Sequence, residues 1–270
     1  MRSIFTGLLL TLLAGSATAD GTFAERAAQA ATGAHRSAEN IARNQYRHPL
    51  ETLAFFGIGD GMRVLEIWPG AGWYTEILAP ALRDNGSFAV ASWDQAVPDQ
   101  PAYRYELPKQ MQATFDAHPG IYDQVEVVAW SPPQSASLGK DGEYDAVLTF
   151  RNIHGWVNNG QAQDVFKEFA RVLKSGGVLG VVQHRAVEGA DPAVSAKSGY
   201  VPEAHVIELA KQAGLVYEAS SEINANPLDT RDHPEGVWTL PPNLALGDTD
   251  REKYLAIGES DRMTLRFRKP

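Results

Sequence analysis

The sequence contains no cysteine. This absence excludes disulfides, thiol nucleophiles, iron–sulfur clusters and zinc sites built on cysteine. Basic residues are also scarce, because 24 Lys and Arg stand against 33 Asp and Glu, which gives a net charge of -9. A chain this acidic offers no electrostatic footprint for phosphate backbones. We therefore expect a small-molecule substrate and no nucleic-acid partner.

Long apolar runs are few, and one of them lies at the N-terminus. Residues 4–13 are mostly apolar and uncharged, follow Arg2, and precede the small-residue pattern 17–19. The run is too short to span a bilayer as a mature helix. The order of Arg2, the apolar run and the small-residue pattern predicts a signal peptide over residues 1–19 and a mature chain that begins at Asp20. We therefore expect a periplasmic or secreted protein, with no integral membrane segment in the mature chain.

The remaining composition is that of a globular protein, with 44% hydrophobic and 21% charged residues. Residues 20–36 are rich in alanine and polar residues, and we expect a tether or a frayed helix there. Apolar runs bounded by turn residues predict strands at 63–67, 87–93, 124–129, 145–150, 178–183, 216–223 and 263–267. Helical patterns fall at 37–46, 50–56, 73–82, 107–117, 162–173 and 202–213.

This alternation predicts one α/β domain over residues 37–270, with a sheet covered by helices on both faces. Ligands bind such sheets at the carboxyl ends of the strands. The segment after the first strand carries the strongest signal there. It reads VLEIWPGAGWYT from Val64 to Thr75, with Gly70 and Gly72 between strand and helix. Glycines in this position let a ligand approach the backbone and the free N–H groups of the helix.

Three features together resemble the class I S-adenosylmethionine-dependent methyltransferases: the acidic Glu66 before the glycine loop, a second strand at the right spacing, and a Leu-Lys-Ser-Gly-Gly turn before the fifth strand. The runs 46–49, 53–56 and 68–74 resemble more narrowly a group of predicted methyltransferases with export signals. The resemblance implies a three-layer, doubly wound, seven-stranded mixed sheet of Rossmann-like type whose last strand is antiparallel.

The resemblance also implies S-adenosyl-L-methionine as cofactor. The residues that it places at the cofactor are Glu66, Gly70, Ala71, Gly72, Ser92, Asp94, Trp130 and Asn152. Two positions depart from the family. Trp68 stands where the family usually has glycine, and the ribose-binding acid falls at Ser92 by spacing, with Asp94 the nearest carboxylate. Trp130 is either an adenine-stacking ring or a core residue, and the same two interpretations apply to Trp68.

The loop after the fourth strand, which in the family lies where the methyl group meets its acceptor, contains Asn152 and His154. His154 is the candidate general base, because an unperturbed imidazole takes up a proton near neutral pH. His184 is the next choice. The loop lacks the Asn-Pro-Pro-aromatic motif of the amino-group methylases of DNA. A small-molecule or lipid-like acceptor is therefore expected, and Arg47 and His48 are further candidates for the pocket.

Other interpretations remain open at this stage. A nicotinamide-binding fold would need a third glycine where Thr75 stands, so a dehydrogenase is a minor alternative. The spacing of Asp229, Asp232 and His233 matches no known metal motif, and we expect no metal. S-adenosylmethionine is made in the cytosol, and a chain exported unfolded cannot carry it. The second hypothesis is therefore a non-catalytic ligand- or partner-binding domain on a methyltransferase scaffold.

Overall fold

The computed structural model of the chain describes residues 21–270, so the expected signal peptide lies outside the described residues. Within that range the strands are β1 (Arg63–Ile67), β2 (Ser87–Ser92), β3 (Glu126–Ala129), β4 (Tyr144–Phe150), β5 (Leu173–His184), β6 (Val216–Ser221) and β7 (Arg262–Arg268). They form one sheet in the order β3-β2-β1-β4-β5-β7-β6, and β7 is antiparallel to both of its neighbours. This confirms the expected mixed sheet. An all-parallel dinucleotide-binding sheet would have a different order.

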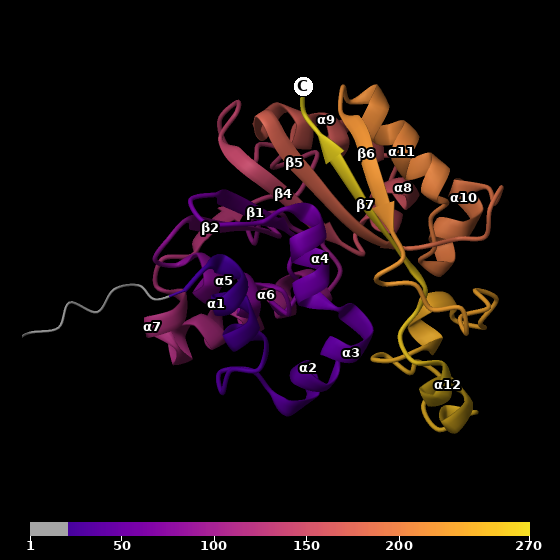
Figure 1. Cartoon of the computed structure of the whole chain (residues 1–270). Coiled ribbons are helices and arrows are strands. Elements are labelled where there is room, and N and C mark those ends of the chain that lie inside the picture. Colours follow the sequence, from indigo (N-terminus) through magenta and orange to yellow (C-terminus); the bar gives the residue numbers. More distant parts are fainter. Residues whose placement is uncertain (1–20) are drawn as a thin grey trace, which may run out of the picture.

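Helices cover both faces of the sheet, which makes three layers (Figure 1). One face packs against α1 (Phe23–Ala31), α4 (Pro49–Phe56), α5 (Thr75–Leu82), α6 (Tyr103–Ala117) and α7 (Pro119–Tyr122). The other face packs against α8 (Ile153–Asn158), α9 (Ala162–Val172), the short helix η1 (Ala196–Ser198) and α11 (Glu203–Gln212). Shorter elements lie between these: α2 (Ala38–Ala42), α3 (Asn44–Arg47), α10 (Pro192–Ser195), η2 (Gly236–Thr239) and α12 (Arg251–Ile257).

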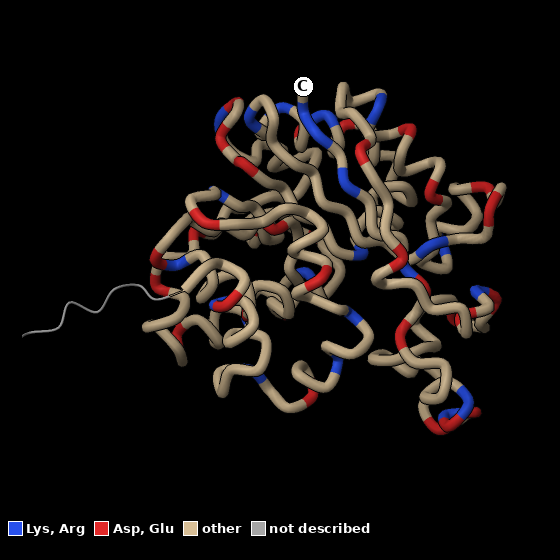
Figure 2. The backbone as a smooth tube through the Cα atoms, viewed as in Figure 1, with Lys and Arg blue, Asp and Glu red and all other residues tan. Residues whose placement is uncertain are grey.

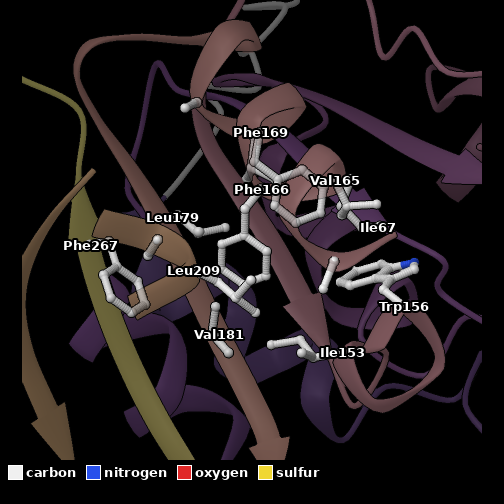
Figure 3. Close-up of a cluster of buried hydrophobic side chains, with 14 of the residues drawn as sticks. Ile67, Ile153, Trp156, Val165, Phe166, Phe169, Leu179, Val181, Leu209 and Phe267 are labelled. Atoms are coloured by element: carbon white, nitrogen blue, oxygen red, sulfur yellow. The ribbon is translucent and has the colours of Figure 1, made fainter. Parts of the chain in front are cut away.

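The alternation of side chains along each strand divides the core in two. In β1, Val64 joins the cluster under α4 and α5, while Leu65 and Ile67 join the cluster under α9 and α11. Figure 3 shows the second cluster, in which Phe166 and Phe169 of α9 lie between strand residues and Trp156. Both faces of the central strands are buried, so these strands are nearly continuous apolar runs.

The N-terminal segment differs from the expectation of a tether or a frayed helix. Helix α1 is capped by Thr22, whose side chain and that of Glu25 form a reciprocal capping box. Phe23, Ala27, Ala30 and Ala31 are buried against the domain. Their spacing places them on one face of a helix, and small alanines allow that face to approach α5 closely. The segment is therefore an integral helix of the domain.

Several short elements were not expected from the sequence, including α7, α8, α10, α12 and both short 3-10 helices. Strand β5 is also longer than expected, because it begins at Leu173 and includes the predicted turn 174–177. Backbone pairing accounts for that extension, since Gly176 donates to Lys269 and Lys269 donates to Gly177. Between residues 21 and 270 no helix has the length and apolar character needed to cross a bilayer.

Candidate functional site

A cavity of about 260 Å³ lies where the carboxyl ends of β1, β4 and β5 meet the N-terminal helices and the segment 237–243. Its walls are mostly polar and aromatic. The residues that line it include Arg43, Arg47, Glu66, Trp68, Gly70, Trp73, Arg151, Asn152, His154, His184, Trp238 and Glu259. The cavity is thus at the edge of the sheet where the topology predicts a ligand.

The glycine loop forms one wall through unusual backbone conformations. Trp68, Gly70 and Gly72 have φ angles of 44°, 65° and 92°, all in the left-handed region. Gly70 faces open space in the cavity wall, whereas a Cβ at Gly72 would lie 3.4 Å from the Cβ of Thr75. The distance at Gly72 is an ordinary contact, so its φ, and not a lack of space, favours glycine there, while Gly70 leaves room for a ligand at the backbone.

Glu66 is a buried carboxyl group at the floor of the cavity. Its Oε2 accepts a hydrogen bond of 2.7 Å from the Thr75 hydroxyl. Burial raises the pKa of Glu66 to about 8, although Thr75 and the positive charge of Arg151 act in the opposite direction. The group is therefore mostly protonated at pH 7 in the absence of a ligand. A cationic ligand beside it would favour the carboxylate.

The end of β4 is tied to the end of β1 by Asn152. Its Nδ2 donates to the carbonyl of Ile67 at 2.8 Å and to Oγ1 of Thr149 at 3.2 Å. The preceding residue, Arg151, has a φ of 66° and extends along the cavity. Asn152 thus fixes the edge at which β1 and β4 present their loops.

His154 lies in α8 at the cavity wall, and its Nδ1 is buried with no hydrogen-bond partner among residues 21–270. Burial, together with the positive charge of Arg151, lowers the pKa of His154 to about 4. The imidazole is therefore neutral at pH 7 and free to accept a proton. It is a weaker base than the unperturbed histidine that the sequence analysis assumed, because the imidazolium would form beside a guanidinium.

His184 at the end of β5 lines the same cavity, with its ring centroid 6.1 Å from that of His154. Its Nδ1 lies 2.5 Å from the hydroxyl of Ser260. Burial holds the pKa of His184 well below its usual value, and His154 and Arg151 add to this effect. Both candidate bases are therefore at the site and both are neutral at pH 7.

The structure brings together Glu66, Gly70, Asn152 and His154 of the predicted site residues. The others, Ala71, Gly72, Ser92, Asp94 and Trp130, do not line this cavity. The Asp94 carboxylate accepts from the backbone of Ala96 at 2.9 Å within its own turn. The Trp130 ring is fully buried among core rings, as in its core interpretation. A cofactor contact at these five positions stays a prediction.

Four tryptophans fill the space beyond the ends of β1 and β2. The ring of Trp68 stacks on Trp93 with a centroid distance of 5.4 Å and an interplanar angle of 28°. It lies 5.3 Å from both Trp130 and Trp156, and its Nε1 donates to the Trp130 carbonyl at 3.2 Å. Arg104 covers the ring at 5.2 Å. The indole of Trp68 is therefore 7% exposed and held on several sides.

The fit of S-adenosylmethionine differs between its two ends. Glu66, Gly70 and the cavity beside them provide a carboxyl group and space for the amino-acid end. The residues that the family resemblance assigns to ribose and adenine, Ser92, Asp94 and Trp130, do not line the cavity. The Trp68 indole packs between Trp93 and Trp130 beside them. The residues present therefore fit the amino-acid end, and none of them forms an open nucleoside subsite in this cavity.

Several residues of the cavity wall were not predicted from the sequence, namely Arg43, Arg151, Trp238, Glu259 and Ser260. Arg151 could have been found, since it precedes Asn152 at the end of a predicted strand. Of the two N-terminal candidates, Arg47 lines the cavity and His48 does not. The polar turn after β6 is structural, because buried Asp229 accepts from Tyr200 and the backbone of Asp261. Over the described range no cluster of three acidic or histidine side chains could hold a metal.

The chain matches no protein-family model and no curated protein sequence. Its fold is similar to a SAM-dependent methyltransferase from Aquifex aeolicus, at 19% identity, covering 68% of this chain and 87% of that one, with a TM-score of 0.52. It is also similar to a SAM-dependent methyltransferase from Methanosarcina mazei, at 12% identity, covering 80% of this chain and 96% of that one, with a TM-score of 0.53. The [4+2]-cyclase SpnF is similar at 19% identity, covering 83% of this chain and 80% of that one, with a TM-score of 0.53. The chain therefore has the methyltransferase fold.

Proposed function

We propose that the chain is an S-adenosylmethionine-dependent methyltransferase that acts on a small-molecule or lipid-like acceptor. One observation carries this proposal. On a methyltransferase fold, the cavity at the ends of β1 and β4 contains Glu66 and Gly70 in one wall and Asn152 and His154 in another. These are the positions at which the family resemblance expects the amino-acid end of the cofactor and the methyl acceptor.

The chemistry that the cofactor supplies is an electrophilic methyl group. In this proposal the chain itself has four tasks. Glu66 forms an ion pair with the amine of the cofactor, and Gly70 lets the ligand approach the loop. His154 accepts the proton that the acceptor loses, while Trp238 and the neighbouring segment limit access of water.

Isothermal titration of the purified chain with S-adenosylmethionine and S-adenosylhomocysteine tests the proposal. We expect binding of both at pH 7 to release a proton, because Glu66 must ionise to pair with the amine. Proton release is measured by repeating the titration in buffers with different ionisation enthalpies. The control ligand is 5′-methylthioadenosine, which lacks the amino-acid end and should bind without proton release. Absence of binding by both amino-acid-bearing ligands contradicts the proposal.

A second candidate is a non-catalytic ligand-binding domain, and the position of the Trp68 indole favours it. A protein that never binds a nucleoside has no need for an open nucleoside subsite, and here that space holds four packed rings. The similarity to a [4+2]-cyclase also agrees with the general finding that one fold serves different functions. Binding of small molecules without any affinity for S-adenosylhomocysteine would favour this candidate over methyl transfer.

We also propose that the chain is exported by the signal peptide predicted over residues 1–19. In that case the cofactor must reach the folded protein outside the cytosol. Export and methyl transfer are separate proposals, since the titration above is performed on purified protein and does not depend on where the cell places it.

A further inference from the structure

The cavity wall contains an excess of positive charge. Among the described residues, the guanidinium groups of four arginines gather around the carboxylate of Glu259. Arg43 and Arg47 belong to the N-terminal helical segment, Arg151 follows β4, and Arg262 begins β7. The first three line the cavity. Three of the four guanidinium groups lie within 3.0 Å of a Glu259 oxygen, and the fourth, that of Arg151, lies at 4.0 Å. One carboxylate cannot neutralise four guanidinium groups.

The other titratable groups at the cavity do not compensate for this charge. They are Glu66, Tyr74, His154 and His184. Burial raises the pKa of Glu66 to about 8 and raises that of Tyr74 further above its usual value, while both histidines are neutral at pH 7. Even with Glu66 ionised, the three arginines that line the cavity would face only two carboxylates, Glu66 and Glu259. Figure 2 shows both signs distributed along the rest of the backbone.

Two of these guanidinium groups keep hydrogen-bonding capacity. Arg47 is 2% exposed, and its Nη1 has no partner within the described part of the chain. Arg151 lies 4.0 Å from Glu259, too far for a hydrogen bond, and its side chain is 25% exposed at the cavity. A buried charged group without a partner is unfavourable, whereas an anion between planar guanidinium groups satisfies both at once.

We propose that the ligand accepted by this cavity is an organic anion, whose carboxylate or phosphate group lies between Arg47 and Arg151 next to His154. This inference deepens the proposed function, and it rests on that function only in assigning the anion to the methyl acceptor. Carboxylate and phosphate groups both have negatively charged oxygens that accept hydrogen bonds from guanidinium groups. We assign the anion to the acceptor because Arg151 and His154 follow β4, and the family resemblance places the methyl acceptor at the loop after this strand.

The proposal has a consequence for His154. The groups that face its imidazole are Arg151, His184 and Gln183, and the charged Arg151 opposes protonation. An anion on Arg151 offsets that charge, so the pKa of His154 rises when the anion binds. The acceptor would then increase the basicity of the group that removes its proton.

Titration of the purified chain with benzoate and with inorganic phosphate tests the proposal, with benzamide as the neutral analogue of benzoate. Binding is followed by tryptophan fluorescence, since Trp68, Trp73 and Trp238 line the cavity. Nitrogen-15 NMR of the imidazole reports the pKa of His154. We expect at least one anion to bind, benzamide not to bind, and the pKa of His154 to rise when the anion is present.

The variant Arg151→Gln removes the guanidinium that has no close partner. We expect it to weaken anion binding by about tenfold or more, as loss of a charge-assisted hydrogen bond does. The matched control is Arg83→Gln, which also removes one guanidinium group. In the parent, Arg83 pairs with Asp123 at the opposite edge of the sheet. Equal affinity of the parent and Arg151→Gln for the anions overturns the proposal, and so does equal affinity of the parent for benzoate and benzamide.

Two further titrations separate the acceptor from the amino-acid end of the cofactor, which also carries a carboxylate. Anion binding that persists at saturating S-adenosylhomocysteine supports the acceptor assignment. Competition between the two ligands overturns that assignment, because the arginines then serve the cofactor. If S-adenosylhomocysteine does not bind but the anions do, the anion site stands and methyl transfer fails. The failure of each proposal is therefore distinguishable.

Discussion

At the scale of single residues, Trp68 combines a left-handed backbone with a bulky side chain. Its φ of 44° suits glycine, and a side chain there is strained by about 1–2 kcal/mol. The packing of its indole against Trp93 and Trp130 offsets this strain. The same residue therefore stabilises the domain and occupies the expected nucleoside space.

The variant Trp68→Gly should consequently bind S-adenosylhomocysteine about tenfold or more tightly than the parent, because the nucleoside no longer has to displace a packed indole. Its free energy of unfolding should fall by about 3–5 kcal/mol, the usual loss for a large aromatic side chain removed from a core. Calorimetric titration and chemical denaturation measure the two effects.

The control for Trp68→Gly is Phe166→Ala, which removes a fully buried ring of α9 outside the four-tryptophan cluster and should leave the affinity unchanged. Free indole should occupy the space left in Trp68→Gly, restore part of its stability and compete with S-adenosylhomocysteine. Stabilisation by indole without competition would show that the nucleoside lies elsewhere.

The variant His154→Ala should reduce methyl transfer by about 10²–10⁴-fold, the range for loss of a general base, while the affinity for the cofactor changes little. The measurement is the single-turnover rate once an acceptor is known, with the binding titration in parallel. His118→Ala, in the turn between α6 and α7, is the control and should keep the parent rate. If His154→Ala transfers methyl groups at a rate close to that of the parent, His154 is not the general base, and the site acts only by positioning the acceptor.

Glu66 should make the stability of the domain fall as pH rises. Its folded pKa of about 8 lies above the usual value of 4.5, so the folded state binds more protons between these pH values. The stabilisation is complete below pH 4.5 and is lost as pH rises through about 8. His154, with a folded pKa of about 4, has the opposite effect between pH 4 and 6.5. The decline should therefore be visible between pH 6.5 and 8.

The variant Glu66→Gln tests this directly, because glutamine keeps an acceptor for the Thr75 hydroxyl but does not ionise. Its Tm should be nearly constant between pH 6.5 and 8, while the Tm of the parent falls. Parallel profiles of parent and variant would mean that another group causes the decline.

At the scale of elements, α4 approaches β5 closely because β5 has a glycine at the contact. A Cβ on Gly180 would lie 2.7 Å from the Phe56 ring and 2.7 Å from Leu148. Gly180→Ala should therefore lower the free energy of unfolding by about 1–3 kcal/mol through overpacking. The control is Gly155→Ala in α8, where a Cβ meets nothing within 4 Å and a helix gains stability. Denaturant unfolding of both variants should give opposite signs.

The sequence predicted the elements whose signal is local. The apolar run 63–67 matches β1 at both ends, and Leu50–Phe56 differs from α4 by one residue. Helices α8 and α12 escaped prediction because they are short and Gly155 interrupts the helical pattern of the first. Apart from Arg47, the cavity residues that were predicted lie in or shortly after strands, as Glu66 and His154 do. Glu259 and Trp238 reach it through long-range packing, which no local pattern encodes.

At the scale of the whole molecule, the location of the chain in the cell can be tested separately from its structure. The order of Arg2, the apolar residues 4–13 and the pattern 17–19 predicts processing after Ala19. N-terminal sequencing of protein from the periplasm or the medium should give Asp20 as the first residue. A start at Met1 in the soluble cell fraction would reject export.

The ion cluster at Glu259 also determines when the site can exist during synthesis. Arg43 precedes Glu259 by 216 residues of chain, and Arg47 precedes it by 212. A chain grows from its N-terminus at about 5–20 residues per second. The two arginines are therefore made well before the carboxylate that they bind. A growing chain that has not yet reached Glu259 has no finished cavity, so ligand capture begins only after that residue is made.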